Sequence, residues 1–93
     1  MIRSFANRET ERLFNDDICP AQWREFKSVA SRKLDIIDAA TSIADMLSPP
    51  GNRLERLKGD RKGQWSIRIN RQWRICFRWT ADGPTDVEIV DYH

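Results

Sequence analysis

The chain has 93 residues, of which 40% are hydrophobic and 32% are charged, and its formal net charge is +2. This length suits one domain with a modest core, here residues 1–93, and the composition is that of a globular protein. We expect neither a transmembrane helix nor a signal peptide, since no apolar run is long enough. Cys19 and Cys76 lack metal-ligand spacing, so we expect free thiols and a cytoplasmic protein.

The charges are distributed unevenly. Residues 1–49 have 7 basic and 8 acidic side chains, residues 50–78 have 9 and 2, and residues 79–93 have none and 4. A basic block on a folded surface favours a polyanion such as nucleic acid, with salt-sensitive binding. A solvated face or an acidic protein partner would give the same pattern.

The first half of the chain predicts mainly helices. Residues 2–5 can form a short strand, and a short helix runs from Asn7 to the pair Asp16-Asp17. From Pro20 to Leu47, apolar residues recur every three or four positions, which predicts one amphipathic helix with a candidate kink near residues 35–38. The prolines and glycine of residues 49–52 end this helix in a loop.

The second half changes to a period of two. Apolar and polar residues alternate over residues 65–70 and 73–79, and Val87 and Ile89 continue the apolar set. This predicts three antiparallel strands, with a short hairpin loop at residues 70–72 and a longer one at residues 80–84. The fold class is therefore α+β, with N-terminal helices on one face of a small, mostly antiparallel sheet and the other face open.

The simplest register keeps the apolar side chains on one face of the sheet. The opposed pairs are then Ile67 and Ile75, Arg68 and Arg74, Arg74 and Val90, Arg78 and Asp86, and Gln72 and Tyr92. Arg68 and Arg74 are side by side without an acid between them, an arrangement that destabilises a sheet. A bound anion would explain the pair, and two arginines splayed into solvent are the alternative.

His93, the only histidine, is suited to proton transfer at neutral pH, although a terminal histidine can also be an inert, frayed residue. No metal-ligand spacing or phosphate-binding loop is found, so we expect no cofactor. The remaining cluster contains cations for a phosphate, an aromatic ring and one titratable group: Lys58, Arg68, Arg74, Tyr92 and His93.

Several short motifs resemble the HigB, or plasmid-maintenance killer, branch of the RelE superfamily of bacterial toxins. They are residues 1–5 (MIRSF), 57–61 (LKGDR), 65–67 (WSI), 72–75 (QWRI) and 91–93 (DYH). The resemblance covers nearly the whole chain and is weakest between Arg8 and Pro50. It implies a small sheet backed by N-terminal helices, in agreement with the predicted architecture.

The resemblance also implies an activity and partners. Members of this branch are ribosome-dependent endoribonucleases that cut mRNA in the decoding site and are inhibited by a cognate helix-turn-helix antitoxin, here HigA-like. Carried over by motif, the expected catalytic residues are Arg74, Lys58, Asp91, Tyr92 and His93. Glu55 stands where the family often has a histidine, which leaves its role as an acid or base uncertain.

Attack of the ribose 2′-hydroxyl on the adjacent phosphate is the mechanism we expect, without a metal ion. RNA contacts are expected from the other basic side chains of this surface, namely Arg61, Lys62, Arg68 and Arg71. The alternative is a toxin of the same superfamily that inhibits gyrase, or that binds the ribosome or RNA without cleavage. The Arg74 and Asp91-Tyr92-His93 constellation favours cleavage, since an inhibitor has no chemical need for it.

Overall fold

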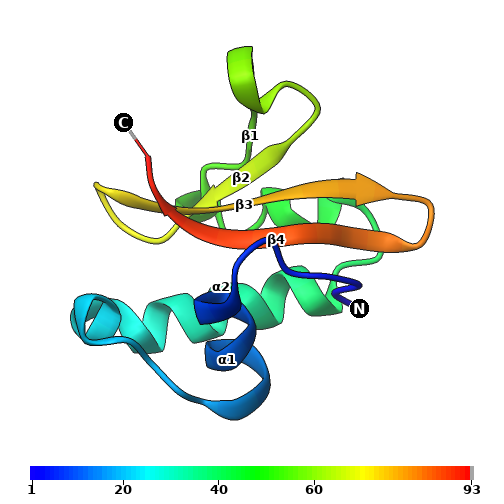
Figure 1. Cartoon of the computed structure of the whole chain (residues 1–93). Helices are drawn as coiled ribbons and strands as arrows, with labels where there is room; N and C mark the ends of the chain where they lie inside the picture. Colours follow the sequence, from blue (N-terminus) through cyan, green and yellow to red (C-terminus); the bar gives the residue numbers. More distant parts are fainter. Residues whose placement is uncertain (93) are drawn as a thin grey trace.

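The structure, a computed structural model, describes residues 1–92 and has the predicted α+β class. Its helices are α1 (Arg8–Asp16), η1 (Ala21–Phe26), α2 (Lys27–Ala39), η2 (Ile43–Leu47), η3 (Pro50–Asn52) and η4 (Gly59–Arg61). Its strands are β1 (Glu55–Arg56), β2 (Trp65–Arg68), β3 (Trp73–Thr80) and β4 (Gly83–Asp91), which form one antiparallel sheet in that order. Figure 1 shows α1 and α2 beneath the sheet. None of these helices is long and apolar enough to cross a bilayer.

The core lies between α2 and the lower face of the sheet. The buried side chains of this layer are Ala30, Leu34 and Ile37 from α2 and Ile67, Ile75, Phe77, Val87 and Ile89 from the strands. The ring of Trp73 lies 5.4 Å from that of Phe26 and 6.3 Å from that of Trp23, which connects η1 to β3. The predicted alternation of the strands is therefore confirmed, and its apolar side is the core.

The N-terminal segment and α1 cover the outer edge of β4. Asn7 caps α1 by accepting a hydrogen bond from the Thr10 backbone N–H at 2.9 Å. The buried Thr10 hydroxyl accepts one from the Ile89 backbone N–H, also at 2.9 Å. The predicted strand over residues 2–5 is limited to one parallel bridge between Phe5 and Val87, because a bulge with Asp86 at a φ of 52° interrupts this edge. The edge is thereby protected from pairing with other chains.

The long helix predicted from Pro20 to Leu47 is wrong, because the chain divides there into η1, α2 and η2. α2 continues as one unbroken helix through residues 35–38 and ends at Ala39, and Ala40 is extended. A capping box begins η2, in which the Asp45 carboxylate accepts hydrogen bonds from the backbone N–H groups of Thr41 and Ser42. The capping box therefore begins a new helix at Ile43, although the apolar residues keep their helical spacing across this point.

The predicted register is confirmed around the centre of the sheet and shifts toward its far end. Ile67 pairs with Ile75 and Arg68 with Arg74, and the Tyr92 backbone N–H donates to the Gln72 carbonyl. Beyond Cys76, a bulge places Arg78 opposite Thr85 instead of Asp86. β3 and β4 are joined by only Ala81 and Asp82, so the prediction of a longer loop over residues 80–84 was wrong.

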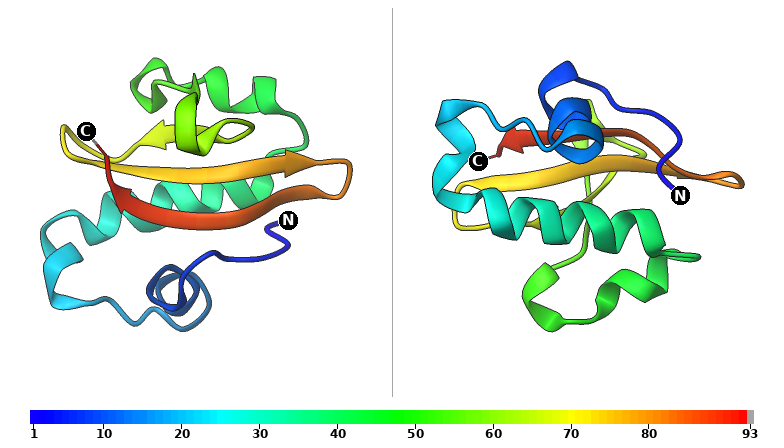
Figure 2. Two further views of the ribbon diagram at one scale, coloured as in Figure 1. Left: turned by 45° about the horizontal axis from the view of Figure 1, so that its top comes forward. Right: turned by 90° about the horizontal axis from the view of Figure 1, so that it is seen from below.

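The upper face of the sheet is partly covered, contrary to the prediction of an open face. The segment with η4, which joins the edge strand β1 to β2, lies above it, on the side opposite α2 (Figures 1 and 2). Ser66 and Cys76 are consequently buried beneath this cover. The Arg61 guanidinium attaches the segment to β4 through an ion pair with Glu88 at 2.8 Å. β1 was not predicted, because two exposed residues show no alternation.

Candidate active site

Arg74 lies near one end of the upper face, opposite the last residue of β2, and its guanidinium is fixed by the fold. Nε donates to the Ser66 hydroxyl at 2.7 Å, and Nη2 donates to the Arg53 carbonyl at 2.6 Å and to the Ser66 carbonyl at 3.4 Å. The side chain is only 12% exposed. Within residues 1–92, Nη1 has no hydrogen-bond partner, so it is the donor left for a ligand.

Two adjacent cavities form a groove across this face. One, of about 360 Å³, is lined by Arg53, Leu54, Glu55, Arg68, Asn70, Arg71, Arg74 and Tyr92. The other, of about 450 Å³, is lined by Glu55, Arg56, Leu57, Lys58 and Tyr92. Glu55 and Tyr92 belong to both, so the groove connects Arg74 with Lys58. The structure therefore brings six of the predicted site residues together: Glu55, Lys58, Arg68, Arg71, Arg74 and Tyr92.

Among residues 1–92, Glu55 is the only carboxylate that lines this groove. In the β1–β2 ladder it lies opposite Ser66, the residue that binds Arg74. Its Oε2 lies 3.8 Å from Nη2 of Arg74, and its side chain is 57% exposed. A solvent-accessible carboxylate beside a fixed cation can accept a proton from a bound hydroxyl.

Arg68 and Arg71 add unpaired positive charge to the Arg74 end of the groove. Arg68 lies directly opposite Arg74, as predicted, and its Nε donates to the Asn70 carbonyl at 3.0 Å. Neither Arg68 nor Arg71 has an ion pair with any residue from 1 to 92. Like charges so placed favour a bound anion, because it would relieve their repulsion.

Asp91 and Arg61 lie apart from the groove. Asp91 is opposite Trp73, on the lower face of the sheet, and its Oδ2 accepts a hydrogen bond from Gln72 Nε2 at 2.9 Å. Arg61 is engaged by Glu88, and this hydrogen bond raises the pKa of the Arg61 guanidinium. Arg61 therefore positions the segment above the sheet, whereas Asp91 orients the end of β3.

Lys62 and His93 complete the predicted set. Lys62 lines a further cavity beyond Lys58. His93 lies outside the described residues, and its role remains a prediction. Cys76 is buried opposite Ser66, and burial raises the pKa of its thiol to about 11, so it is neutral and not a nucleophile at pH 7. Within residues 1–92, no three His, Cys, Asp or Glu side chains gather as a possible metal site.

A buried polar network, absent from the predictions, supports the Arg53 carbonyl. Lys33 of α2 donates to the Asn52 side-chain carbonyl, and Asn52 Nδ2 donates to the carbonyls of Met46 at 3.2 Å and Ser48 at 3.3 Å. Burial, and secondarily the charge of Arg32, lowers the pKa of Lys33. The network fixes the loop that precedes β1, and with it one of the acceptors of Arg74.

Ser66 was also missed, although its position beside Arg74 in the predicted register was a usable signal. Arg53 gave no signal, since its contribution is a backbone carbonyl in a residue with a φ of 44°. The same holds for Lys33, which the apolar period of its helix does not distinguish from a solvent-facing lysine.

The α+β fold, with helices on one face of a four-stranded antiparallel sheet, is consistent with a RelE-like toxin. Residues 3–93 match the family described as "RelE-like toxin of type II toxin-antitoxin system HigB", so the chain belongs to the HigB-like toxins. A toxin of this class has an antitoxin partner. The chain is 37% identical over 97 residues to Toxin HigB-1 of Vibrio cholerae serotype O1, covering 100% of this chain and 98% of that protein. It is 32% identical over 93 residues, and over all of both chains, to the Endoribonuclease HigB of Proteus vulgaris.

Proposed function

We propose that this toxin, acting as one domain over residues 1–93, is an endoribonuclease that cleaves mRNA in the decoding site of the ribosome. The observation that carries the proposal is Arg74, whose Nε and Nη2 are bonded to the protein while the residue lines a groove shared with Glu55, Lys58 and Tyr92. The activity in the name of the Proteus vulgaris relative supports it. The site of action is the cytoplasm, where ribosomes and mRNA are found.

The chemistry is a transfer of the phosphate within the RNA, without a metal ion. The 2′-hydroxyl loses its proton, its oxygen bonds to the adjacent phosphorus, and the bond from phosphorus to the 5′-oxygen breaks. The products are a 2′,3′-cyclic phosphate and a 5′-hydroxyl, so no oxidant or cofactor is consumed. The protein has to supply a proton acceptor, a proton donor and cations for the developing charge.

Glu55 accepts the proton of the 2′-hydroxyl in this scheme, and His93 donates one to the leaving 5′-oxygen. A carboxylate at this position would repel the phosphate. The ion pair between Glu55 and Arg74 offsets this repulsion. Arg74 and Lys58 stabilise the charged transition state, and Arg74 needs no reorganisation because the fold has already fixed its guanidinium. Tyr92, on the wall common to both cavities, stacks on a base.

The remaining predicted residues have supporting roles. Arg68, Arg71 and Lys62 bind the phosphates that flank the cleaved one. Arg61 and Asp91 position neighbouring segments, since each is bonded to a protein side chain. The antitoxin is a HigA-like helix-turn-helix protein that binds the toxin and keeps it inactive.

The decisive experiment maps the 5′ ends of mRNA after brief expression of the wild type and of Arg74→Ala. Discrete new ends inside translated reading frames are expected for the wild type only. Stalled replication with intact mRNA would instead identify a gyrase inhibitor. In a purified reaction, an mRNA with hydrogen in place of the 2′-hydroxyl at the cut should bind but remain whole, and normal cleavage of it would refute the mechanism.

A further inference from the structure

A third cavity lies beside the groove and shares Lys58 with it. It measures about 510 Å³ and is lined by Arg56, Leu57, Lys58, Gly59, Lys62 and Gly63. Arg56, Leu57 and Lys58 also line the cavity of about 450 Å³ that contains Tyr92. The third cavity therefore extends the groove past Lys58, away from Arg74.

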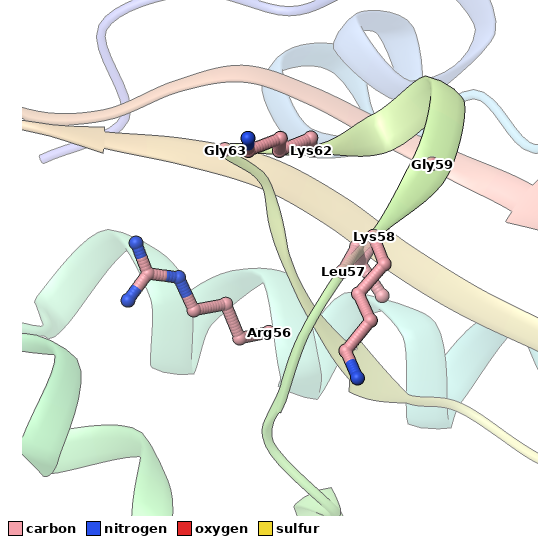
Figure 3. A pocket seen from close by; sticks show the side chains of 6 residues that line it. All are labelled: Arg56, Leu57, Lys58, Gly59, Lys62 and Gly63. Carbon is pink, nitrogen blue, oxygen red and sulfur yellow. The ribbon is translucent and has the colours of Figure 1, made fainter.

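Its lining combines an apolar floor with a cationic rim. Leu57 is only 4% exposed, and Gly59 contributes bare backbone, with nothing within 4 Å of the place where a Cβ would stand. The side chains of Arg56, Lys58 and Lys62 extend in different directions around this floor (Figure 3). Among residues 1–92, no acidic side chain lines the cavity. An apolar surface surrounded by positive charge suits a flat, uncharged ring attached to phosphates.

Arg56 is restrained at the rim by Trp65. Its guanidinium carbon lies 5.6 Å from the centre of the Trp65 ring, within the range of a cation–π interaction. Arg56 has no ion pair among the described residues that would occupy its charge. A restrained guanidinium plane is a surface on which RNA bases stack, at a smaller entropy cost than a mobile one.

We propose that this cavity binds the base of a nucleotide flanking the cleaved phosphate, on the Lys58 side of the groove. The inference rests on the proposed function and adds a substrate subsite to it. The strand enters the groove with the cleaved phosphate between Arg74 and Lys58, places the flanking base against Leu57 and Arg56, and continues past Lys62. Because the lining is mainly apolar, the base is bound by stacking and shape, so this subsite adds affinity with little choice among the four bases.

Single-turnover cleavage on programmed ribosomes tests the subsite, with an abasic residue moved through the positions flanking the cut. One abasic position should lower kcat/KM of the wild type about tenfold, chiefly through KM, because stacking is lost in the ground state. Arg56→Met should lower kcat/KM on intact mRNA by about the same factor. For Arg56→Met, replacing intact mRNA by the same abasic mRNA should lower kcat/KM by no more than about twofold.

Arg8→Met, an exposed substitution on α1, is the matched control and should retain the full abasic effect. The subsite is refuted if no abasic position slows the wild type, or if the effects of Arg56→Met and of the abasic residue multiply. Both of these results leave cleavage itself, and thus the proposed function, intact. A wild type that cleaves no mRNA at all refutes both. Circular dichroism of Arg56→Met excludes loss of fold, which is not expected for an exposed side chain.

Discussion

Arg74 offers a ligand only one edge of its guanidinium, since Ser66 and the Arg53 carbonyl bind the others. A fixed donor stabilises a transition state more than a mobile one, because the cost of ordering it is met when the chain folds. Arginine is suited to this task in a way that lysine is not. Its planar fork is bonded to two protein acceptors and keeps a further donor for a phosphate, whereas an ammonium is a single point of charge.

We therefore expect Arg74→Lys to lower kcat about 100-fold, although the positive charge remains. Single-turnover cleavage of mRNA on ribosomes measures the effect. Arg68→Lys is the control, because Arg68 makes only one hydrogen bond to the protein and is not expected to stabilise the reacting phosphate. This variant should lower kcat by less than about fivefold. Equal losses in the two variants would show that the geometry of Arg74 is unimportant.

Glu55→Gln should lower kcat at least about 100-fold while leaving the binding of mRNA nearly unchanged, since the amide cannot accept the 2′-hydroxyl proton. Glu55→His should retain activity within about tenfold, because imidazole can perform the same proton transfer. The pH dependence of kcat separates the two variants. Full activity of Glu55→Gln would leave His93 as the remaining candidate for the base.

At the scale of the elements, the strands were predictable because each is read from its own alternation. Trp65 to Ile69 and Trp73 to Trp79 both show it, and these residues also determined the pairing of Arg68 with Arg74. The division of the long helix was not predicted, although the capping signal from Ser42 to Asp45 was present in the sequence. A period shared by three consecutive helices conceals the points where the backbone changes direction.

The part of the site that could not be predicted is contributed by loops and backbone. Arg53 binds Arg74 through its carbonyl, and the loop is fixed by Lys33 and Asn52 from inside the fold. Side-chain chemistry alone does not reveal a carbonyl acceptor. Arg74, Lys58 and Tyr92 could be predicted because their side chains carry charge or an aromatic ring, together with their motifs.

Asn52→Ala should reduce the free energy of unfolding by about 2 kcal/mol, because two backbone carbonyls and the buried Lys33 lose their partner. It should also lower kcat, since the loop that positions the Arg53 carbonyl loses its anchor. Urea denaturation and cleavage assays at a temperature where the variant is folded measure the two effects. Asn7→Ala, which removes the cap of α1 at a cost of about 1 kcal/mol, should leave kcat unchanged.

At the scale of the whole molecule, positive charge is concentrated on the face that carries the groove, although the net charge of the chain is only +2. The groove and its extension include Arg68, Arg71, Lys58 and Lys62. Association with RNA should therefore be strongly dependent on salt, because each neutralised phosphate releases counterions.

Arg71→Gln should weaken RNA binding at low salt and reduce the slope of log K against log salt concentration by about 0.7, the value for one contact with a single strand. Fluorescence anisotropy with a short, uncleavable deoxy-substituted RNA gives the slope. Arg8→Gln on α1 should leave it unchanged. If both variants change the slope equally, the charge acts through a general field and not through contacts in the groove.

Cys76 makes the stability of the toxin sensitive to alkaline pH. Burial raises the pKa of its thiol from 9.0 to about 11, so the folded state binds this proton more tightly than the unfolded state. The resulting contribution, about 2 to 3 kcal/mol, is complete below pH 9 and is lost as the pH rises toward 11. Urea denaturation at several pH values should show a steeper decrease for the wild type than for Cys76→Ala. Parallel decreases would mean that Cys76 is accessible in the folded state.

The chain of contacts from Lys33 through Asn52 to the Arg53 carbonyl has a consequence for genetics. A toxin gene is under pressure to be silenced whenever its antitoxin fails, and cells that survive carry the silencing substitutions. Because Arg74 depends on acceptors supplied by Ser66 and by this loop, survivors should carry changes at Ser66, Asn52 and Lys33 as well as at the groove itself. Such alleles would still encode a protein whose surface is intact, and an antitoxin that recognises that surface would continue to bind it.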